Sequence, residues 1–269
     1  MQQRRSTIVL ALRLTVLLAV ICGWEAAASF GWIDPFFFGR PSGVARQIRE
    51  WVTEGTPQGS LWVQMFVTLE EAVLGFLIGS AAGAVCGIGL GRNPFLADVL
   101  HVYIKIANTI PRVVLGSIFV ISLGLGMASK VALAVVMVFF VVFANAFQGV
   151  RETDRTMIAN AQILGASPWQ VTATVVIPSA MSWILASAHV SFGLALVGAV
   201  LGEVLGARQG LGQLISTAQG AFNANGAFAA MIILVVMALV AEGVITGIEN
   251  RIVRWKPAQC VARPRSNWA

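Results

Sequence analysis

The residues in this sequence that could do chemistry are carboxylates placed inside otherwise apolar segments. Glu203 and Glu242 lie within long apolar runs, and Glu70 and Glu71 lie at the mouth of another. A proton- or sodium-coupled carrier would need such groups near the middle of a membrane. Glu203, however, lies only about one turn from the end of its run, where a carboxylate could reach interfacial water. We therefore favour interfacial or helix-packing roles and keep ion coupling as the alternative.

No other pattern predicts a reactive centre. The cysteines Cys22, Cys86 and Cys260 are far apart, and no Cys-x-x-Cys spacing occurs. His101 and His189 stand alone in the sequence. The phosphate-binding loop Gly-x-x-x-x-Gly-Lys-Ser/Thr is also missing, so the chain has no such loop for ATP hydrolysis. We expect no catalytic residues, no metal site and no cofactor bound by this chain.

The composition is that of a protein embedded in a lipid bilayer. Of the 269 residues, 57% are hydrophobic and only 11% are charged, and the mean hydropathy is +0.81. A soluble domain would carry roughly twice that charged fraction. We expect a multi-pass integral membrane protein. The net charge of +6 then reflects membrane topology, and nucleic-acid binding is not indicated.

Apolar runs long enough to cross the bilayer determine the predicted fold. A helix needs about 20 apolar residues to span ~30 Å of hydrocarbon, and each span must be helical because lipid offers backbone groups no hydrogen-bond partner. The sequence predicts an all-α membrane protein with six transmembrane helices. The runs cover residues 7–30, 73–90, 99–123, 131–147, 181–205 and 228–248.

Lys and Arg residues predict the orientation, because cytoplasmic connections carry an excess of them. With the N-terminus inside, roughly twice as many lie on the cytoplasmic side as outside. Both termini are therefore expected in the cytoplasm. Residues 1–6 form the N-terminal segment, 7–254 one transmembrane domain, and 255–269 a cytoplasmic tail. The segment 31–64 becomes an external connection, in which 44–52 could form a surface helix.

Two features concern helix packing and a possible water path. Glycine recurs at every fourth position of the second run, which stacks the glycines into a smooth ridge for close helix approach. The ridge serves either packing within the chain or sliding of another subunit or helix. Pro111 and Arg112 interrupt the third run, where a kink and a charge are typical of a pathway lining. Glu203 is the third candidate for that lining, and a plain structural kink is the alternative. The ridge consists of Gly75, Gly79, Gly83, Gly87 and Gly91.

We call residues 150–178 the elbow. This segment is longer than a passive connection needs, and it carries clear signals for helix ends. Apolar residues mark one face of a first helix, and Gly165 then supplies a helix stop. Ser167, Pro168 and Gln170 form the start of a second helix, a capping box with proline at the first position. That helix is expected to run until Pro178 opens the next transmembrane helix. The apolar face holds Met157, Ile158, Ala161 and Leu164.

The elbow resembles the cytoplasmic EAA loop of ABC importer permeases. Gly165 and Pro178 have the spacing of that loop, and Ala161 occupies the last place of its Glu-Ala-Ala triplet, whose first two places here hold Ala159 and Asn160. The stretches "TLEEAVLGF", "IPRVVLGSIFVISLGLGMASK" and "VGAVLGEVLGARQGLGQLI" are similar to segments of nitrate/sulfonate/taurine-type permeases. The resemblance spans roughly residues 60–255.

The resemblance implies a transport subunit of the bacterial inner (plasma) membrane rather than an enzyme. Two permease chains, expected to be two copies of this one, form the pathway. Each elbow docks on a cytoplasmic ATPase dimer that binds ATP and Mg, and an external substrate-binding protein delivers the solute. Trp169 is the best docking anchor by composition, with packing at the membrane interface as the alternative. The positions expected to couple to the ATPase are Ala161, Gly165, Ala166, Ser167, Pro168, Trp169 and Pro178.

The expected solute is small and anionic, organic or inorganic, in keeping with the nitrate, sulfonates and taurine carried by the family. Arg112 and Lys105 are weak further hints of an anion path. A self-sufficient ion-coupled secondary carrier remains the alternative function, because it would use the intramembrane carboxylates.

Overall fold

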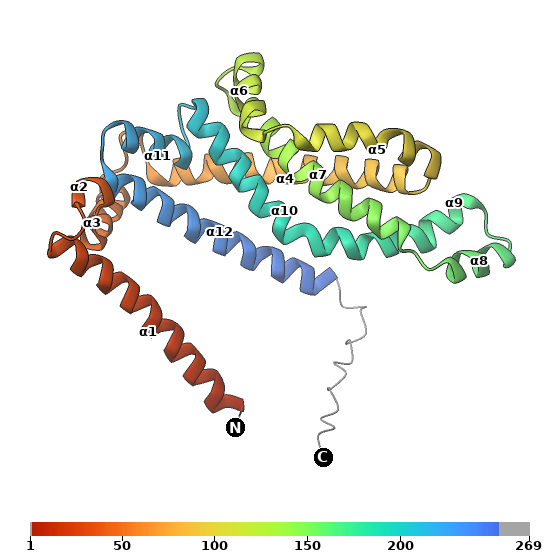
Figure 1. Ribbon diagram of the computed structural model, residues 1–269, viewed down its shortest axis with the longest axis horizontal. Helices are drawn as coiled ribbons and strands as arrows, with labels where there is room; N and C mark the ends of the chain where they lie inside the picture. The colour runs from red at the N-terminus through yellow and green to blue at the C-terminus, as the bar shows by residue number, and fades with distance from the viewer. Residues whose placement is uncertain (1, 253–269) are drawn as a thin grey trace.

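The protein is helical almost throughout, as the computed structural model shows (Figure 1). The structure describes residues 2–252, and no strand occurs among them. The predicted tail, 255–269, lies outside this range. The long helices are α1 (Gln2–Ser29), α4 (Leu61–Gly91), α7 (Met127–Arg151), α10 (Ile177–Gly206) and α12 (Ala224–Ile252).

Each long helix is apolar enough to cross a membrane, which gives five spans in the described part of the chain. The third predicted run forms two helices instead of one, α5 (Pro94–Thr109) and α6 (Arg112–Leu123). Their axes differ by 83°. The count reaches the predicted six only if this bent pair is taken as one broken span.

Pro111 explains why this run breaks rather than kinks. A residue before proline is sterically kept out of the helical region, and Ile110 accordingly has an extended ψ of 126°. Pro111 is itself extended, with ψ of 118°, and caps the N-terminus of α6. The predicted interruption at Pro111 is therefore present as a break, because the extended conformation of two successive residues starts a new helix in a new direction.

Helices α4, α7 and α10 form the core, and the predicted glycine ridge lies between α4 and α7. A Cβ added at Gly75 would lie 2.3 Å from the Cβ of Ala134, and one at Gly87 would lie 2.6 Å from the carbonyl oxygen of Phe143. No larger side chain fits at these points, so the two helices touch along their backbones. The ridge is an internal packing surface of this chain, the first of the two uses considered.

One end of the molecule gathers short helices around the start of α12: α2 (Pro35–Phe38), α3 (Pro41–Thr53) and α11 (Leu211–Gly220) (Figure 1). The helix predicted over 44–52 is thus present as α3. It is held by the buried side chains of Val44 and Trp51. Helix α11 follows α10 and was not predicted as a helix.

Helix α1 approaches the rest of the chain only near its C-terminal end. The ring of Trp24 meets that of Phe228 on α12 at 5.2 Å, and the carboxylate of Glu25 accepts hydrogen bonds from the backbone and side chain of Ser42. Most of the described side chains of α1 before Trp24 are exposed. The elbow lies at the opposite end of the bundle from α2, α3 and α11 (Figure 1).

Candidate functional site

The first helix of the elbow, α8 (Arg155–Ile163), ends in a turn that requires glycine. Gly165 has a φ of +81°, a conformation that side-chain-bearing residues rarely adopt. Its N–H donates to the carbonyl of Gln162 at 3.0 Å, and the N–H of Ala166 donates to that of Ala161 at 3.0 Å. Both bonds satisfy carbonyls left free at a helix end, the Schellman pattern. The predicted helix stop is confirmed.

The second helix, α9 (Pro168–Val171), begins with the predicted capping box. The backbone N–H of Ser167 donates to Oε1 of Gln170 at 2.7 Å, and the N–H of Gln170 donates to Oγ of Ser167 at 3.3 Å. Two backbone donors that would otherwise lack partners are thereby satisfied. The two arms of the elbow are therefore joined by a turn defined on both sides by hydrogen bonds.

A widened turn, η1 (Thr172–Val176), links α9 to α10 without interrupting the helix. The N–H of Ile177 donates to the carbonyl of Thr172, five residues back. Pro178 has no N–H, and its ring would crowd the carbonyl four residues before it in a regular helix. A π turn relieves this crowding. Pro178 therefore does not open a separate helix, because one helical run extends over Pro168–Gly206.

The tip of the elbow exposes large apolar side chains. Their exposed fractions range from 61% to 86%, and nothing in the described part of the chain covers them. A group of exposed apolar side chains of this kind is typical of a site that another protein covers. They are Met157, Ile163, Leu164 and Trp169.

The base of the elbow, in contrast, is packed into the bundle. Val150 at the end of α7, Val176 in η1 and Ala180 in α10 form a small buried cluster, against which Ile88 of α4 packs. Thr153 is buried beside them and donates to the carbonyl of Gly149 at 3.1 Å. The base of the elbow is therefore in contact with all three core helices.

At the other end of the bundle, buried polar side chains hold the first turn of α11. We call this group the polar clamp: Gln64, Thr68 and Glu203, with the backbone N–H groups of residues 210–212. All three side chains have an exposed fraction of 0%. Glu203 on α10 accepts from Oγ1 of Thr68 at 2.7 Å and from the N–H of Gly212 at 2.6 Å.

The remaining clamp bonds come from α4. Oε1 of Gln64 accepts from the N–H of Gly210 at 2.7 Å, and Oγ1 of Thr68 accepts from the N–H of Leu211 at 2.8 Å. Three consecutive N–H groups at the start of α11 thus each have a buried side-chain partner. Free N–H groups at a helix start favour a carboxylate, which explains why Glu203 is stable in this apolar setting.

Two positions of the clamp require glycine because no space is left there for a side chain. A Cβ at Gly210 would lie 2.1 Å from Oε1 of Glu203, and the φ of Gly210 is +113°. A Cβ at Gly212 would lie 2.6 Å from the carbonyl oxygen of Val200. The Gly-Leu-Gly sequence therefore lets the backbone come within hydrogen-bond distance of the carboxylate.

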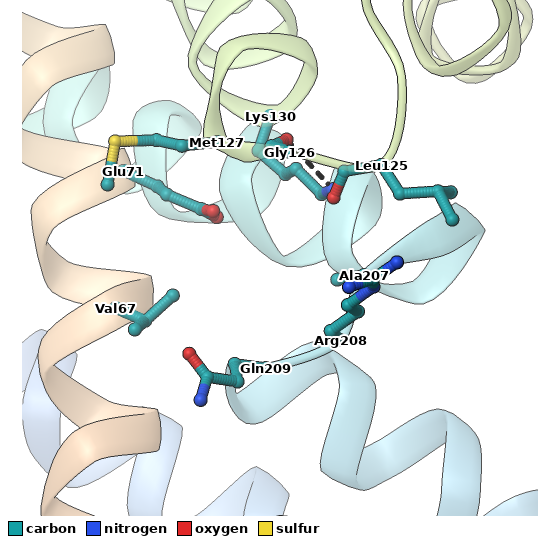
Figure 2. Close-up of a pocket in the computed structure, with 9 residues that line it drawn as sticks. All are labelled: Val67, Glu71, Leu125, Gly126, Met127, Lys130, Ala207, Arg208 and Gln209. Atoms are coloured by element: carbon teal, nitrogen blue, oxygen red, sulfur yellow. Dashed lines mark hydrogen bonds between the residues drawn. The ribbon is translucent and has the colours of Figure 1, made fainter.

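A cavity of about 420 Å³ adjoins the polar clamp (Figure 2). It lies between α4, the start of α7 and the segment after α10. Its charged lining groups are Glu71, Lys130 and Arg208. The ammonium group of Lys130 donates to the backbone carbonyls of Leu125 and Gly126. Oε2 of Glu71 is buried without a hydrogen-bond partner. The other lining residues are Val67, Leu125, Gly126, Met127, Ala207 and Gln209.

The structure separates the three residues predicted to line a pathway. Pro111 is exposed and Arg112 half-buried at the start of α6, and neither lines this cavity. Glu203 belongs to the clamp and is not a lining residue either. The expectation that Glu203 reaches interfacial water is wrong, because Thr68 and Gly212 hold its carboxylate in a fully buried position. Its alternative role in helix packing is the one observed.

Sequence reasoning missed most of this second region. Gln64 lay in the predicted external connection, and Lys130 lay just before the fourth predicted run, 131–147. The sole signal was the four-residue spacing of Gln64 and Thr68, which places both on one face of a helix.

His189, which stands alone in the sequence, lies between two carboxylates of α12: Nδ1 is 2.6 Å from Glu242 and Nε2 is 2.9 Å from Glu249. No group of described His, Cys, Asp and Glu residues is arranged to hold a metal ion.

Comparison with known protein families gives one match that covers most of the chain. The sequence profile described as "Binding-protein-dependent transport system inner membrane component" matches residues 75–254. This range includes the elbow, the glycine ridge, Lys130, Glu203 and α11, but not Gln64, Thr68 or Glu71.

Individual relatives agree with this match. An aliphatic sulfonate transport permease of Bacillus subtilis is 26% identical over 88% of this chain and 84% of its own length. An ABC transporter permease of Haemophilus influenzae is 30% identical over 80% and 86%. The taurine transport permease of Escherichia coli is 27% identical over 90% and 87%.

Solved structures with a similar fold include a chain of the methionine ABC transporter in an inward-facing conformation. The TM-score is 0.62 at 20% identity, and the match covers 72% of this chain and 96% of that one. A chain of an amino acid ABC transporter gives 0.57 at 19% identity, over 70% and 92%. At this level of identity the likeness concerns the fold alone.

Proposed function

Since the chain belongs to the family of binding-protein-dependent transport system inner membrane components, we propose that its elbow couples it to a separate cytoplasmic ATPase. The predicted relationship to sulfonate and taurine permeases is confirmed. The chain is a multi-pass inner-membrane permease of an ABC importer. Two copies form the solute pathway, an ATPase dimer supplies the energy, and an external binding protein supplies the solute.

The observation that carries the proposal is the contrast within the elbow. Its tip exposes Ile163, Leu164 and Trp169, whereas its base is buried against α4, α7 and α10. An apolar surface on a protruding, hydrogen-bonded turn is suited to an apolar groove on a partner. Closure of an ATPase dimer on ATP would move the tips, and the packed bases would transmit that movement to the core helices.

The arrangement of hydrogen bonds explains why the elbow can transmit force. Its turn is closed by the bonds of Gly165 and Ala166 on one side and by the capping box of Ser167 on the other. A segment whose backbone groups are satisfied resists local unfolding better than an open loop. The elbow therefore moves as a unit, and little displacement is lost in deforming it.

The solute is proposed to be small and anionic. Relatives named for aliphatic sulfonates and taurine support this class, and so do Lys130 and Arg208 in the cavity. The ion-coupled carrier has less support, because its best-placed carboxylate, Glu203, is fully committed to hydrogen bonds within the clamp.

Co-purification tests the proposed coupling. The full chain is produced together with ABC ATPase subunits from the same genome, and the complex is isolated in detergent through a tag on the permease. We expect the ATPase to co-elute and Trp169→Ala to weaken its binding about tenfold or more, as truncation of an interface anchor does. Trp169 is 69% exposed, so the melting temperature of the permease alone should not change.

Trp32→Ala is the matched control. Trp32 is also a highly exposed tryptophan, at 81%, but it lies between α1 and α2, at the end opposite the elbow. The control should retain full ATPase binding. Solute uptake by the permease alone in liposomes, or failure of any ATPase to associate with it, would contradict the proposal.

A further inference from the structure

Helix α12 is packed more tightly over its first half, residues 224–237, than over its second half, residues 238–252. The side chains of Ala229, Ala230 and Ile233 belong to the main buried cluster of the bundle. Met237 is the last side chain of α12, within the described part of the chain, that is buried. Over residues 236–245 an apolar groove of about 630 Å³ lies between α12 and α4. Packing therefore holds the second half of α12 less firmly than the first.

A cluster of three ionisable side chains joins this second half to α10. His189 of α10 lies between Glu242 and Glu249, which are about two turns apart on one face of α12. Its Nδ1 atom is 2.6 Å from Oε1 of Glu242, and its Nε2 atom is 2.9 Å from Oε2 of Glu249. Within the apolar span Ala224–Gly247, Glu242 is the one ionisable residue. The charged groups of α12 are thus placed where packing is weakest.

The two distances require a proton in each contact. An unprotonated ring nitrogen and a carboxylate oxygen are both acceptors and would repel each other so close together. A neutral imidazole carries one N–H and an imidazolium carries two, so the second proton belongs either to the ring or to one of the carboxyl groups. The ring is favoured, because imidazole is more basic than a carboxylate. The angle at Nδ1 departs from that of a hydrogen bond, so the contact with Glu242 is mainly electrostatic.

We propose that His189 is an imidazolium whose two ion pairs hold the second half of α12 against α10. A carboxylate within an apolar span is costly unless a group of opposite charge accompanies it, and His189 is that group for Glu242. Because packing holds the first half of α12, loss of the charge at His189 frees only the second half. That half borders the groove to α4, so its release changes the width of the groove. This attachment does not depend on the coupling proposed for the elbow.

Nitrogen-15 NMR of the full chain with labelled histidine, in lipid nanodiscs at neutral pH, tests the charge. The chain has two histidines, so the variant His101→Gln leaves only the signals of His189. We expect both ring nitrogens of His189 to have the chemical shift of a protonated nitrogen. One protonated and one unprotonated nitrogen would overturn the proposal, because the second proton would then lie on a carboxyl group.

Distances between pairs of spin labels test the attachment, in a chain without its native cysteines. Labels at Met181 of α10 and Val244 of α12 report on the second half of α12, and labels at Val197 and Ile232 report on the first half. All four side chains are exposed, so the labels fit without displacing the core. In His189→Ala we expect the first distance to become longer and more broadly distributed, while the second distance stays unchanged.

Two further variants separate the role of charge from a general loss of structure. His189→Lys keeps a positive charge with three N–H donors and should retain the shorter distance, and His101→Gln, the matched control at the other histidine, should change neither distance. An unchanged first distance in His189→Ala, or equal changes in both distances, would overturn the proposal. A change in His189→Lys as large as that in His189→Ala would also overturn it, since charge would then not be what holds the helix.

Discussion

The elbow and the polar clamp differ in the polarity and the burial of their side chains. At the elbow, Ile163, Leu164 and Trp169 are apolar and exposed, with nothing in the described chain to cover them. In the clamp, Gln64, Thr68 and Glu203 are polar and fully buried, and each accepts a hydrogen bond from α11 or α4. The hydrogen bonds of the clamp are complete within one chain, whereas the apolar tip of the elbow is left uncovered by the described chain.

Because of this difference, substitutions in the two regions should affect different properties, the stability of the permease and its assembly with a partner. Substitutions in the clamp remove interactions that exist in the folded monomer, so they should act on unfolding. Under the proposed coupling, substitutions at the tip of the elbow remove interactions that form only in the complex with the ATPase, so they should act on assembly, as expected for Trp169→Ala. The following substitutions test how sharp this division is.

Glu203→Ala should give the largest loss of stability. It removes the acceptor for the N–H of Gly212 and the nearer acceptor for Oγ1 of Thr68, which retains only a longer bond of 3.2 Å to the carbonyl of Gln64, and both donors remain in a buried site. The expected cost is about 4 kcal/mol, at 1–3 kcal/mol for each unsatisfied buried group plus the cavity left by the side chain. Unfolding in mixed detergent micelles measures it. Glu70→Ala, a half-buried glutamate outside the clamp, is the control and should stay within about 0.5 kcal/mol.

Gly210→Ala should destabilise by slightly less, about 3 kcal/mol. The new Cβ would meet the carboxylate of Glu203 and would have to adopt a φ of +113°, a conformation that strains any residue with a side chain. Gly220→Ala at the other end of α11 meets nothing within 4 Å and provides the comparison by the same unfolding measurement. Equal losses for the two variants would mean that α11 is not held at its first turn.

Ser167→Ala should have the smallest effect, about 1 kcal/mol, the usual cost of losing a helix N-cap. It removes the acceptor for the N–H of Gln170 and leaves the buried base of the elbow intact. We expect faster amide hydrogen exchange in α9 with the global unfolding midpoint nearly unchanged. A lowered global midpoint would show that the elbow contributes to folding as the clamp does.

The elbow could be predicted from the sequence because its signals are local. Ser167 and Gln170 are three residues apart, and Gly165 precedes them directly, so each hydrogen bond of the turn joins near neighbours. The clamp could not be predicted in this way. The bond between Thr68 and Glu203 joins residues 135 positions apart, and the bond between Gln64 and Gly210 joins residues 146 apart. A single sequence holds no local pattern for such contacts.

Hydropathy misplaced the helix ends for a related reason. The second run was expected to begin at residue 73, yet α4 begins at Leu61. The first three turns of α4 carry Gln64, Thr68 and Glu71, which lower the local hydropathy although all three are buried. Composition does not distinguish polar residues buried inside the bundle from polar residues in water. The resemblance to ABC importer permeases identified the family correctly, because the order and spacing of motifs do not depend on whether a polar residue is buried or exposed to water.

The unbroken helical run Pro168–Gly206 connects the two regions. Its 39 residues correspond to roughly 58 Å at 1.5 Å per residue, with Trp169 near one end and Glu203 near the other. Because each residue turns a helix by about 100°, gaining or losing a single residue inside this run would rotate one end away from its partners while the other kept its own. The distance in sequence between Trp169 and Glu203 is therefore as much a constraint on this protein as the identity of either residue.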